Sequence, residues 1–243
     1  MPIATYWADA YLQKRRSAAD AIRMVKSGHR VFIGSACGQP QELVRALSEA
    51  AARLSGLEIV RLLSTETTPL SALADQTQDF ALNLRTIYLG AANSELIARH
   101  QRFIAPMNMS DVPDLFISKK LPIHAALIQV SPPDDFGWMS LGISVDVTLA
   151  AAMSADLVIA QVNPQMPRVL GQSFIHVNDV DIMVEHEEPL LSVESRPTSE
   201  IGSRIGQMIA RLVEDGSTIQ MGLDAASQAT LQALGEKNDL GVP

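Results

Sequence analysis

The segment richest in residues that could do chemistry is residues 131–146, SPPDDFGWMSLGISVD. It directly follows the apolar run of residues 125–130, and it carries Gly137, Gly142 and the carboxylate of Asp146. Open α/β sheets bind their ligands in loops at the carboxyl ends of buried strands. The pattern therefore predicts a rigid binding loop, followed by a helix whose first turn carries Asp146.

A second candidate is the loop of residues 34–40, GSACGQP, between a predicted strand and a predicted helix. Its glycines allow close backbone approach to a ligand, and the free N–H groups of the following helix attract an anion. The spacing matches neither a P-loop nor the dinucleotide-binding fingerprint. Two interpretations remain open, a tight turn or a cradle for an anion or a carbonyl oxygen. The candidate binding residues are Gly34, Ser35, Gly38, Gln39 and Pro40.

Cys37 lies in the same loop and is the only cysteine of the chain. A catalytic thiol needs an activating base, and no histidine lies nearby in the sequence. We therefore interpret Cys37 as a small buried filler. A single cysteine also forms no internal disulfide, as suits a reducing cytoplasm.

A third candidate is residues 161–168, QVNPQMPR, again directly after an apolar strand. Two prolines fix the backbone, Asn163 could cap a helix or bind a ligand, and Arg168 could pair with a carboxylate or phosphate. The alternative is a stiff surface loop. The acidic residues 185–188 match no metal-site spacing and are interpreted as a solvated turn. His176 is interpreted as a hydrogen-bonded structural histidine.

Helix and strand patterns alternate along the chain, which is typical of an α/β fold with an open, mostly parallel sheet and helices on both faces. Several strands are apolar throughout, as in parallel strands covered on both sides. Residues 99–120 fit no regular pattern, and we expect a surface excursion there. Helices are predicted over residues 17–26, 42–54, 146–153, 199–213 and 225–234, and strands over residues 31–33, 58–63, 86–89, 125–130, 157–162, 181–184 and 217–221.

The composition limits the classes of partner. With 243 residues, of which 47% are hydrophobic, the chain can bury a substantial core. A formal charge of −8 argues against nucleic acid, because phosphate contacts need a basic surface. No transmembrane span or signal peptide is apparent. The sequence thus predicts a soluble, cytoplasmic protein with neither nucleic-acid nor membrane partners.

Three segments together resemble one enzyme family. Residues 131–146 match a Ser-Pro-Pro-Asp…Ser-Leu-Gly…Ser-Val-Asp loop, residues 158–176 a run from Val-Ile-Ala-Gln-Val-Asn to Ile-His, and residues 212–222 with 239–241 the stretch that closes a first half. These segments resemble the acetyl-CoA hydrolase/CoA-transferase family, of the 4-hydroxybutyrate/acetate CoA-transferase type. The resemblance implies the CoA-transferase fold and a single N-terminal domain over residues 1–243, with the family's catalytic C-terminal half absent.

The resemblance also implies a mechanism, in which CoA moves between an acyl-CoA and a short carboxylate such as acetate, or the thioester is hydrolysed, through a glutamyl-CoA thioester. No residue here matches the motif of that glutamate, so we expect no catalytic residue in this chain and no activity from this half alone. Coenzyme A enters as a substrate rather than as a permanently bound cofactor, and no metal is expected. The implied substrate- or CoA-binding residues are Gly34, Ser35, Gly38, Gln39, Pro40, Gly137, Gly142, Asn163, Met166, Arg168 and Gly222.

The implied partners are an acyl-CoA, a short carboxylate and the missing C-terminal half of the same protein. The apolar face that this half leaves exposed favours a homodimer.

Two positions depart from the family pattern and keep an alternative open. Asp224 stands where the family has a glycine, so its side chain obstructs close backbone approach and its charge repels CoA phosphates or an acyl carboxylate. Val169 stands where the family usually has threonine. A non-catalytic module that binds CoA or an acyl ligand is therefore the alternative. A sugar-phosphate isomerase on a similar sheet is disfavoured by the long match to the CoA family.

Overall fold

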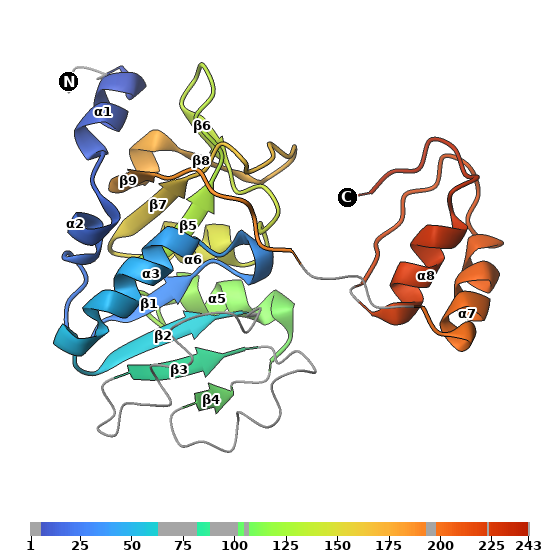
Figure 1. Cartoon of the computed structure of the whole chain (residues 1–243), viewed down its shortest axis with the longest axis horizontal. Helices are drawn as coiled ribbons and strands as arrows, with labels where there is room; N and C mark the ends of the chain where they lie inside the picture. Colours follow the sequence, from blue (N-terminus) through green and yellow to red (C-terminus); the bar gives the residue numbers. More distant parts are fainter. Residues whose placement is uncertain are drawn as a thin grey trace. The chain divides into compact units, whose positions relative to one another are not determined.

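The computed structural model describes residues 6–62, 82–87, 102–104, 107–192, 198–222 and 224–242. The chain divides into two compact units, Met1–Ser192 and Val193–Pro243 (Figure 1). The first unit contains a parallel sheet, and the second contains a pair of helices. That residues 1–243 form one N-terminal domain stays a prediction.

The first unit is built on a seven-stranded sheet in the order β4-β3-β2-β1-β5-β7-β9, in which every pair is parallel. The chain adds β2, β3 and β4 on one side of β1 and then returns to add β5, β7 and β9 on the other. The strand order therefore reverses between β1 and β5. The strands are β1 (Arg30–Ile33), β2 (Leu57–Arg61), β3 (Leu82–Thr86), β4 (Arg102–Ile104), β5 (Ala125–Val130), β7 (Val158–Val162) and β9 (Ile182–Glu185).

Helices cover both faces of this sheet, which confirms the predicted α/β class. Residues of α2 (Ala18–Ile22) and α3 (Gln41–Ala50) pack in one buried cluster with the sheet. Residues of α5 (Val112–Ile117) and α6 (Thr148–Ser154) pack in a second cluster that contains other residues of the same strands. Because side chains alternate along a strand, the two clusters lie on opposite faces of the sheet.

The remaining elements of the first unit are short. A two-stranded antiparallel sheet pairs β6 (Trp138–Ser140) with β8 (Phe174–His176). At the N-terminus, α1 (Trp7–Lys14) places Trp7, Ala10 and Tyr11 against the second cluster. The 3₁₀ turns in the described part of this unit are η1 (Ala36–Gly38), η2 (Ala51–Arg53), η4 (Met109–Asp111) and η5 (Val177–Asp179). No helix within the described ranges is long and apolar enough to cross a membrane.

Several sequence-based expectations are wrong in detail. Residues 99–120 are not one irregular excursion, because they contain β4 and α5, and Phe116 of α5 is fully buried with its ring edge toward Phe32. The strand expected at residues 86–89 begins at Leu82, and residues 88–89 lie outside the described part. Asp146 lies before the helix, because α6 begins at Thr148 with Val147 at the N-cap position, and its carboxylate accepts the N–H of Thr148 at 2.9 Å.

In the second unit, α7 (Glu200–Ala210) packs on α8 (Ala225–Ala233). A Cβ at Gly206 would lie 2.6 Å from the carbonyl of Ala229, so only glycine permits this close approach of the two helices. The strand expected at residues 217–221 is wrong. Only an isolated parallel bridge joins Thr218 and Gly241, because the described part of this unit offers no longer neighbouring strand.

Glu58, near the amino end of β2, pairs with two arginines, Arg30 and Arg85. Its carboxylate lies 2.7 Å from Arg30 and 2.5 Å from Arg85, and its side chain is 18% exposed. Burial alone would raise the pKa of Glu58. Hydrogen bonds from Arg85 and Arg30 and their positive charges outweigh this effect and hold the pKa below its usual value.

Glu58→Gln should lower the free energy of unfolding at neutral pH by about 1–3 kcal/mol, because both guanidinium groups lose this carboxylate in a partly buried place. Urea unfolding measures the change. The pKa of Glu58 is lower in the folded than in the unfolded state, so its stabilisation is present above about pH 4.5 and is lost as the pH falls through the folded-state pKa. Variant and parent should therefore converge in acid.

The exposed Glu49→Gln is the matched control, and it should change stability by less than about 0.5 kcal/mol. A stability difference between Glu58→Gln and the parent that stays constant into strong acid would contradict the assignment.

Candidate functional site

The two glycine-containing loops lie where the strand order of the sheet reverses. Residues 34–40 follow β1 and residues 131–146 follow β5, and these two strands are hydrogen-bonded neighbours. The chain leaves their carboxyl ends toward opposite sides of the sheet, and ligands of open α/β sheets bind in the crevice that this reversal creates. The N–H of Gly34 continues the ladder by donating to Leu127 at 2.9 Å.

The two loops contact each other through Ser144. Its hydroxyl donates to the carbonyl oxygen of Ser35 at 3.0 Å. A Cβ on Gly38 would lie 2.2 Å from the Cβ of Ser144, so no other residue fits at position 38 without moving a loop. The glycine of the GSACGQP motif is therefore required by the packing of one loop on the other.

Unfavourable local features gather at Ser35 and Ala36. The Ser35 side chain is 1% exposed, and its Oγ has no hydrogen-bond partner within the described part of the chain. An unbonded buried hydroxyl costs about 1–3 kcal/mol. Ala36 has φ 46°, in the left-handed region, which costs an L-residue about 1–2 kcal/mol. Such costs are typical of functional sites. Burial also raises the pKa of the neighbouring Cys37 thiol, which favours the filler interpretation.

Buried amide side chains tie this loop to the rest of the carboxyl edge. Gln129 on β5 and Gln161 on β7 are paired in register, and Asn163 follows β7 directly; none is more than 2% exposed. Gln129 donates to the carbonyl oxygen of Gln39 at 3.0 Å, and its own oxygen accepts from Asn163 at 2.8 Å. The loop after β1 and the loop after β7 are thereby linked through one side chain of β5.

Gln161 also closes the N-terminus of α3. Its side-chain oxygen accepts the backbone N–H groups of Glu42 at 3.0 Å and Leu43 at 3.4 Å. The sequence offered these N–H groups to an anion, but the protein's own amide already occupies them. Two of the N–H groups expected to be free at this helix terminus are therefore already bonded, and an anion at these loops needs other donors.

Part of the acidic segment 185–188 belongs to the same network, so its interpretation as a solvated turn is wrong. The side chain of Glu188 is only 12% exposed, and its carboxylate accepts from Gln161 at 2.7 Å and from Arg45 at 2.7 Å. Its backbone carbonyl accepts from Asn163 at 2.8 Å. Within the described residues, no group of three or more His, Cys, Asp or Glu could hold a metal ion.

Gly142 and Met166 are brought into contact. Gly142 has φ 60°, and a Cβ there would lie 2.2 Å from the sulfur of Met166 and 2.9 Å from the carbonyl oxygen of Pro167. Gly137 has φ 85°, and a Cβ there would lie 2.8 Å from His176 Nε2. That imidazole nitrogen lies 3.0 Å from the carbonyl oxygen of Phe136, which fits the predicted structural role of His176.

Arg168 pairs with a carboxylate of the chain itself. Its guanidinium donates to Asp134 at 2.5 Å and to the carbonyl oxygen of Trp138 at 3.0 Å, and it lies 4.5 Å from the ring centroid of Phe174. Burial would raise the pKa of Asp134, but backbone N–H donors at Trp138 and Phe136 and the charge of Arg168 lower it. Arg168 therefore fastens the β6–β8 sheet to the loop before it.

The predicted binding residues thus fall into three places. The first place holds the residues of the two loops beside β1 and β5 and the start of the loop after β7, which are in mutual contact: Gly34, Ser35, Gly38, Gln39, Pro40, Gly142, Asn163 and Met166. The second place holds Gly137 and Arg168, whose contacts lie around the β6–β8 sheet. Gly222 belongs to the second unit, where its N–H donates to the Ser227 hydroxyl at 3.2 Å.

Asp224 has a structural role. Its carboxylate accepts the N–H groups of Ala226 at 2.8 Å and Ser227 at 3.1 Å, so it caps α8. Hydrogen bonds from the side chain and backbone of Ser227 lower the pKa of Asp224. The N-terminus of α8 is therefore closed by the chain's own charge.

Sequence reasoning assigned no site role to Gln129, Ser144, Gln161 or Glu188, although all but Gln129 lie in segments that it had singled out. A signal existed for the two glutamines, because each is the only polar residue in an otherwise apolar strand and each stands one position before the strand ends. Polar side chains in a strand that is buried on both faces need partners. Nothing local distinguished Ser144 or Glu188.

The reversed strand order, with polar loops in contact at its carboxyl edge, defines an α/β protein of the ligand-binding open-sheet class. A family model described as acetyl-CoA hydrolase/transferase N-terminal domain matches residues 5–194. The chain belongs to this family, as the resemblance implied.

Two relatives of known name are CoA-transferases. The 4-hydroxybutyrate coenzyme A transferase of Clostridium kluyveri is 38% identical over 236 residues, which is 97% of this chain and 54% of the relative. The succinyl-CoA:acetate/propanoyl-CoA:succinate CoA transferase of Fasciola hepatica is 35% identical over 219 residues, or 90% of this chain and 45% of the relative. The chain thus spans about half the length of these relatives.

Solved structures confirm the predicted CoA-transferase fold. RipA from Yersinia pestis superposes with a TM-score of 0.87 at 28% identity, covering 98% of this chain and 57% of that one. The 4-hydroxybutyrate CoA-transferase of Porphyromonas gingivalis gives a TM-score of 0.74 at 29% identity, covering 96% of this chain and 54% of that one.

Gly142→Ala should lower the free energy of unfolding by about 2–5 kcal/mol, because a left-handed backbone and a steric clash act together. The control is Gly171→Ala, where φ is 90° but nothing lies within 4 Å of an added Cβ. This control carries the backbone cost alone, about 1–2 kcal/mol. Chemical unfolding of both variants measures the difference, and equal losses would show that the contact with Met166 and Pro167 is not tight.

Proposed function

We propose that residues 1–243 supply the first half of an enzyme that moves coenzyme A between an acyl-CoA and a short, acetate-like carboxylate. One observation carries the proposal: in a chain of this family, a strained loop with an unbonded buried hydroxyl lies at the reversal of strand order. This is where an open α/β sheet receives a ligand. The substrate class is inferred from the names of the relatives. That the chain is one half of the enzyme is inferred from its span of about half their length.

In the proposed reaction, a glutamate carboxylate from outside residues 1–243 attacks the thioester carbonyl of the acyl-CoA. The C–S bond breaks, CoA leaves as a thiolate, and an acyl–glutamyl anhydride remains. The thiolate then attacks the glutamyl carbonyl, which releases the first carboxylate and forms glutamyl-CoA. The second carboxylate takes CoA by the same steps in reverse.

This chain contributes binding and charge stabilisation to those steps. Each attack puts negative charge on a carbonyl oxygen, and preorganised donors at that oxygen lower the barrier. The Ser35 hydroxyl is a donor without a hydrogen-bond partner among the residues that the structure describes. The loop that carries it is held by Ser144 and Gln129, so its position is fixed by contacts that involve no ligand.

The proposal treats coenzyme A as a substrate that comes and goes, with no permanently bound cofactor. It places the protein in the cytoplasm, because the single Cys37 suits a reducing compartment, and it includes a homodimer as the assembled form. The formal charge of −8 argues against a nucleic-acid partner, whereas a small anionic substrate needs only a local patch of donors.

The deciding experiment is an exchange assay on the natural gene product that contains residues 1–243, expressed whole. Acetyl-CoA and a short carboxylate are supplied, and borohydride reduction with mass spectrometry locates a glutamyl-CoA adduct. We expect exchange, with the adduct on a glutamate outside residues 1–243. CoA binding without exchange or adduct would instead favour the non-catalytic binding module, for which the closed, negatively charged N-terminus of α8 at Asp224 is the supporting observation.

Ser35→Ala in the same protein should lower kcat/KM by about tenfold or more, because a donor to the developing oxyanion is removed. The free energy of unfolding should rise by about 1–3 kcal/mol, since the variant removes a buried hydroxyl that has no partner among the described residues and breaks no hydrogen bond. Ser144→Ala is the control for stability. It removes the hydrogen bond to the backbone carbonyl oxygen of Ser35 and should lower the free energy of unfolding by about 1 kcal/mol. Full activity of Ser35→Ala would remove that hydroxyl from the proposed site.

A further inference from the structure

The hydroxyl group of Ser35 is closed off from ligands in this structure. Ser35 is 1% exposed, and its Oγ is a buried atom without a hydrogen-bond partner in the described part of the chain. A substrate oxygen has to come within about 2.5–3.0 Å of this Oγ to accept its proton. Part of the site therefore has to move before Ser35 bonds to a ligand.

The turn of residues 35–38, here called the Ser35 turn, is held to its surroundings by one hydrogen bond. The turn is closed internally, because the N–H of Gly38 donates to the carbonyl oxygen of Ser35 at 3.0 Å. From outside the turn, the Ser144 hydroxyl donates to the same oxygen at 3.0 Å. Among the described residues, no other hydrogen bond joins the turn to a segment outside the loop of residues 34–40.

The parts of the loop on either side of this turn are anchored to β5. The N–H of Gly34 donates to the carbonyl oxygen of Leu127 at 2.9 Å, and the carbonyl oxygen of Gln39 accepts from Gln129 at 3.0 Å. Neither of these bonds involves the Ser35 turn itself. When the bond from Ser144 breaks, the turn is therefore free to swing between two fixed ends.

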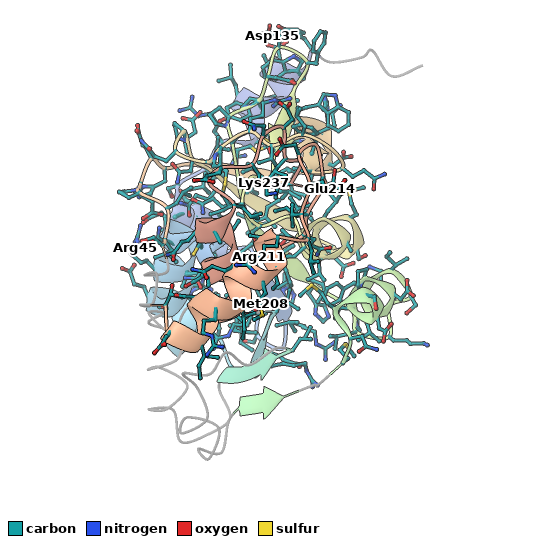
Figure 2. The ribbon with its side chains drawn as sticks, turned by 90° about the vertical axis from the view of Figure 1, so that its right-hand side faces the viewer. Arg45, Asp135, Met208, Arg211, Glu214 and Lys237 are labelled. Carbon is teal, nitrogen blue, oxygen red and sulfur yellow. The ribbon has the colours of Figure 1, made fainter. Side chains whose placement is uncertain are left out.

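The loop after β5 is fastened by side chains of other elements. Asp135 lies at the outer tip of this loop, where it is labelled in Figure 2. Its carbonyl oxygen accepts from Nε1 of Trp7 at 3.0 Å, and the neighbouring Asp134 accepts from Arg168 at 2.5 Å. Breaking the bond between the two loops thus moves the Ser35 turn rather than Ser144.

The hydroxyl of Ser144 has a second acceptor within reach. Oδ2 of Asp146 lies 3.1 Å from its Oγ, nearly the same distance as the carbonyl oxygen of Ser35. A serine hydroxyl carries a single hydrogen, so it donates fully to one of the two acceptors at a time. Hydrogen bonds to a carboxylate are about twice as strong as those between neutral groups, so Asp146 competes effectively for this proton. While Asp146 holds the proton, the bond that holds the Ser35 turn is absent.

Asp146 is itself fixed in the position of a competitor. Its other oxygen, Oδ1, accepts the N–H of Thr148 at 2.9 Å and the hydroxyl of Thr148 at 2.8 Å. Thr148 is 2% exposed and begins α6, so the carboxylate is anchored to a buried part of the fold. Oδ2 is thereby left facing Ser144.

We propose that Asp146 is a positioning residue that makes the Ser35 turn releasable. It accepts the Ser144 proton when the turn opens, and the opening exposes the Ser35 hydroxyl to an oxygen of the acyl-CoA or of the carboxylate substrate. The bond between Gly38 and Ser35 moves with the turn, which therefore opens as an ordered unit. The identity of the ligand rests on the proposed function, whereas the opening does not.

Thiol labelling measures the opening without an activity assay. Ser35→Cys combined with Cys37→Ala places one thiol in the loop, at the buried position, in the natural gene product expressed whole. N-ethylmaleimide is the reagent, and mass spectrometry follows the labelling of the peptide that contains position 35. The reagent reaches this thiol only when the turn is open, so the labelling rate reports how often the turn opens.

Asp146→Asn in this background should slow labelling about fivefold. The amide oxygen takes the place of Oδ1, because the N–H of Thr148 needs an acceptor there, and the amide nitrogen then donates to Oγ of Ser144. The Ser144 proton is left with the carbonyl oxygen of residue 35 as its acceptor. Asp156→Asn is the matched control, since its side chain is 69% exposed and lies outside both loops. It should leave the rate unchanged within about twofold.

Ser144→Ala supplies a second test. It should speed labelling about fivefold, because the bond that holds the turn is removed, and Asp146→Asn should then have no further effect. Equal rates for Asp146→Asn and its parent, or the same slowing in the absence of the Ser144 hydroxyl, would overturn the role of Asp146. Labelling of the parent as fast as that of unfolded protein would also overturn it, because the turn would not be closed.

Steady-state kinetics with Ser35 and Cys37 restored connects the opening to catalysis. Asp146→Asn should raise KM for the acyl-CoA about fivefold and leave kcat within about twofold, because a smaller fraction of molecules is open to substrate. A loss of kcat at unchanged KM would overturn the access role. Slower labelling in a protein that transfers no CoA would keep the release of the turn and remove the proposed function, and CoA transfer with unchanged labelling would do the reverse.

Discussion

The side-chain amide of Gln161 is the contact on which the carboxyl edge of the sheet depends. Its oxygen satisfies two N–H groups at the start of α3, and its nitrogen donates to Glu188. Buried polar groups left without partners cost more than most single contacts gain, so this amide determines where α3 begins and where the segment after β9 lies. Gln129, which accepts a hydrogen bond from Gln161, in turn donates to the carbonyl oxygen of Gln39 and so holds the loop after β1 in place. The candidate site is thus supported by amides that never need to touch a ligand.

The fold class could be predicted because strands buried on both faces leave a strong signature in the sequence. β5 matches its predicted bounds, β7, α7 and α8 lie within three residues of theirs, and α3 ends four residues before its predicted end. The described helices and strands that were missed are α1, α5, β4, β6 and β8, all of eight residues or fewer, a length at which periodicity carries little information. The strand predicted at residues 217–221 is absent for another reason. An alternating pattern shows that a segment suits a strand, but a strand also needs a neighbouring segment with which to form hydrogen bonds, and only the isolated bridge to Gly241 is present.

The candidate site could be predicted only where its residues are contiguous. Glycine and proline punctuation located the three loops, because backbone requirements are local. The network that joins these loops could not be found in this way, since Gln129 and Gln161 are separated by 32 positions and meet only through the register of β5 and β7. Arg168 shows the converse limit: its residue type suggested a ligand, whereas Asp134, 34 positions away, supplies the partner. Residue type indicates what a side chain could bind, and the fold decides what it does bind.

Ala36, with its left-handed backbone, makes the loop after β1 stiff. A glycine at that position would relieve about 1–2 kcal/mol of steric strain. It would also enlarge the conformational freedom of the unfolded chain by about 0.5–1 kcal/mol, so the two effects largely offset each other in stability. They do not offset each other in mobility, because the methyl group removes alternative loop shapes that glycine would allow. In the proposed function, the loop therefore meets the substrate already ordered, and binding avoids the entropy loss that ordering a flexible loop would add.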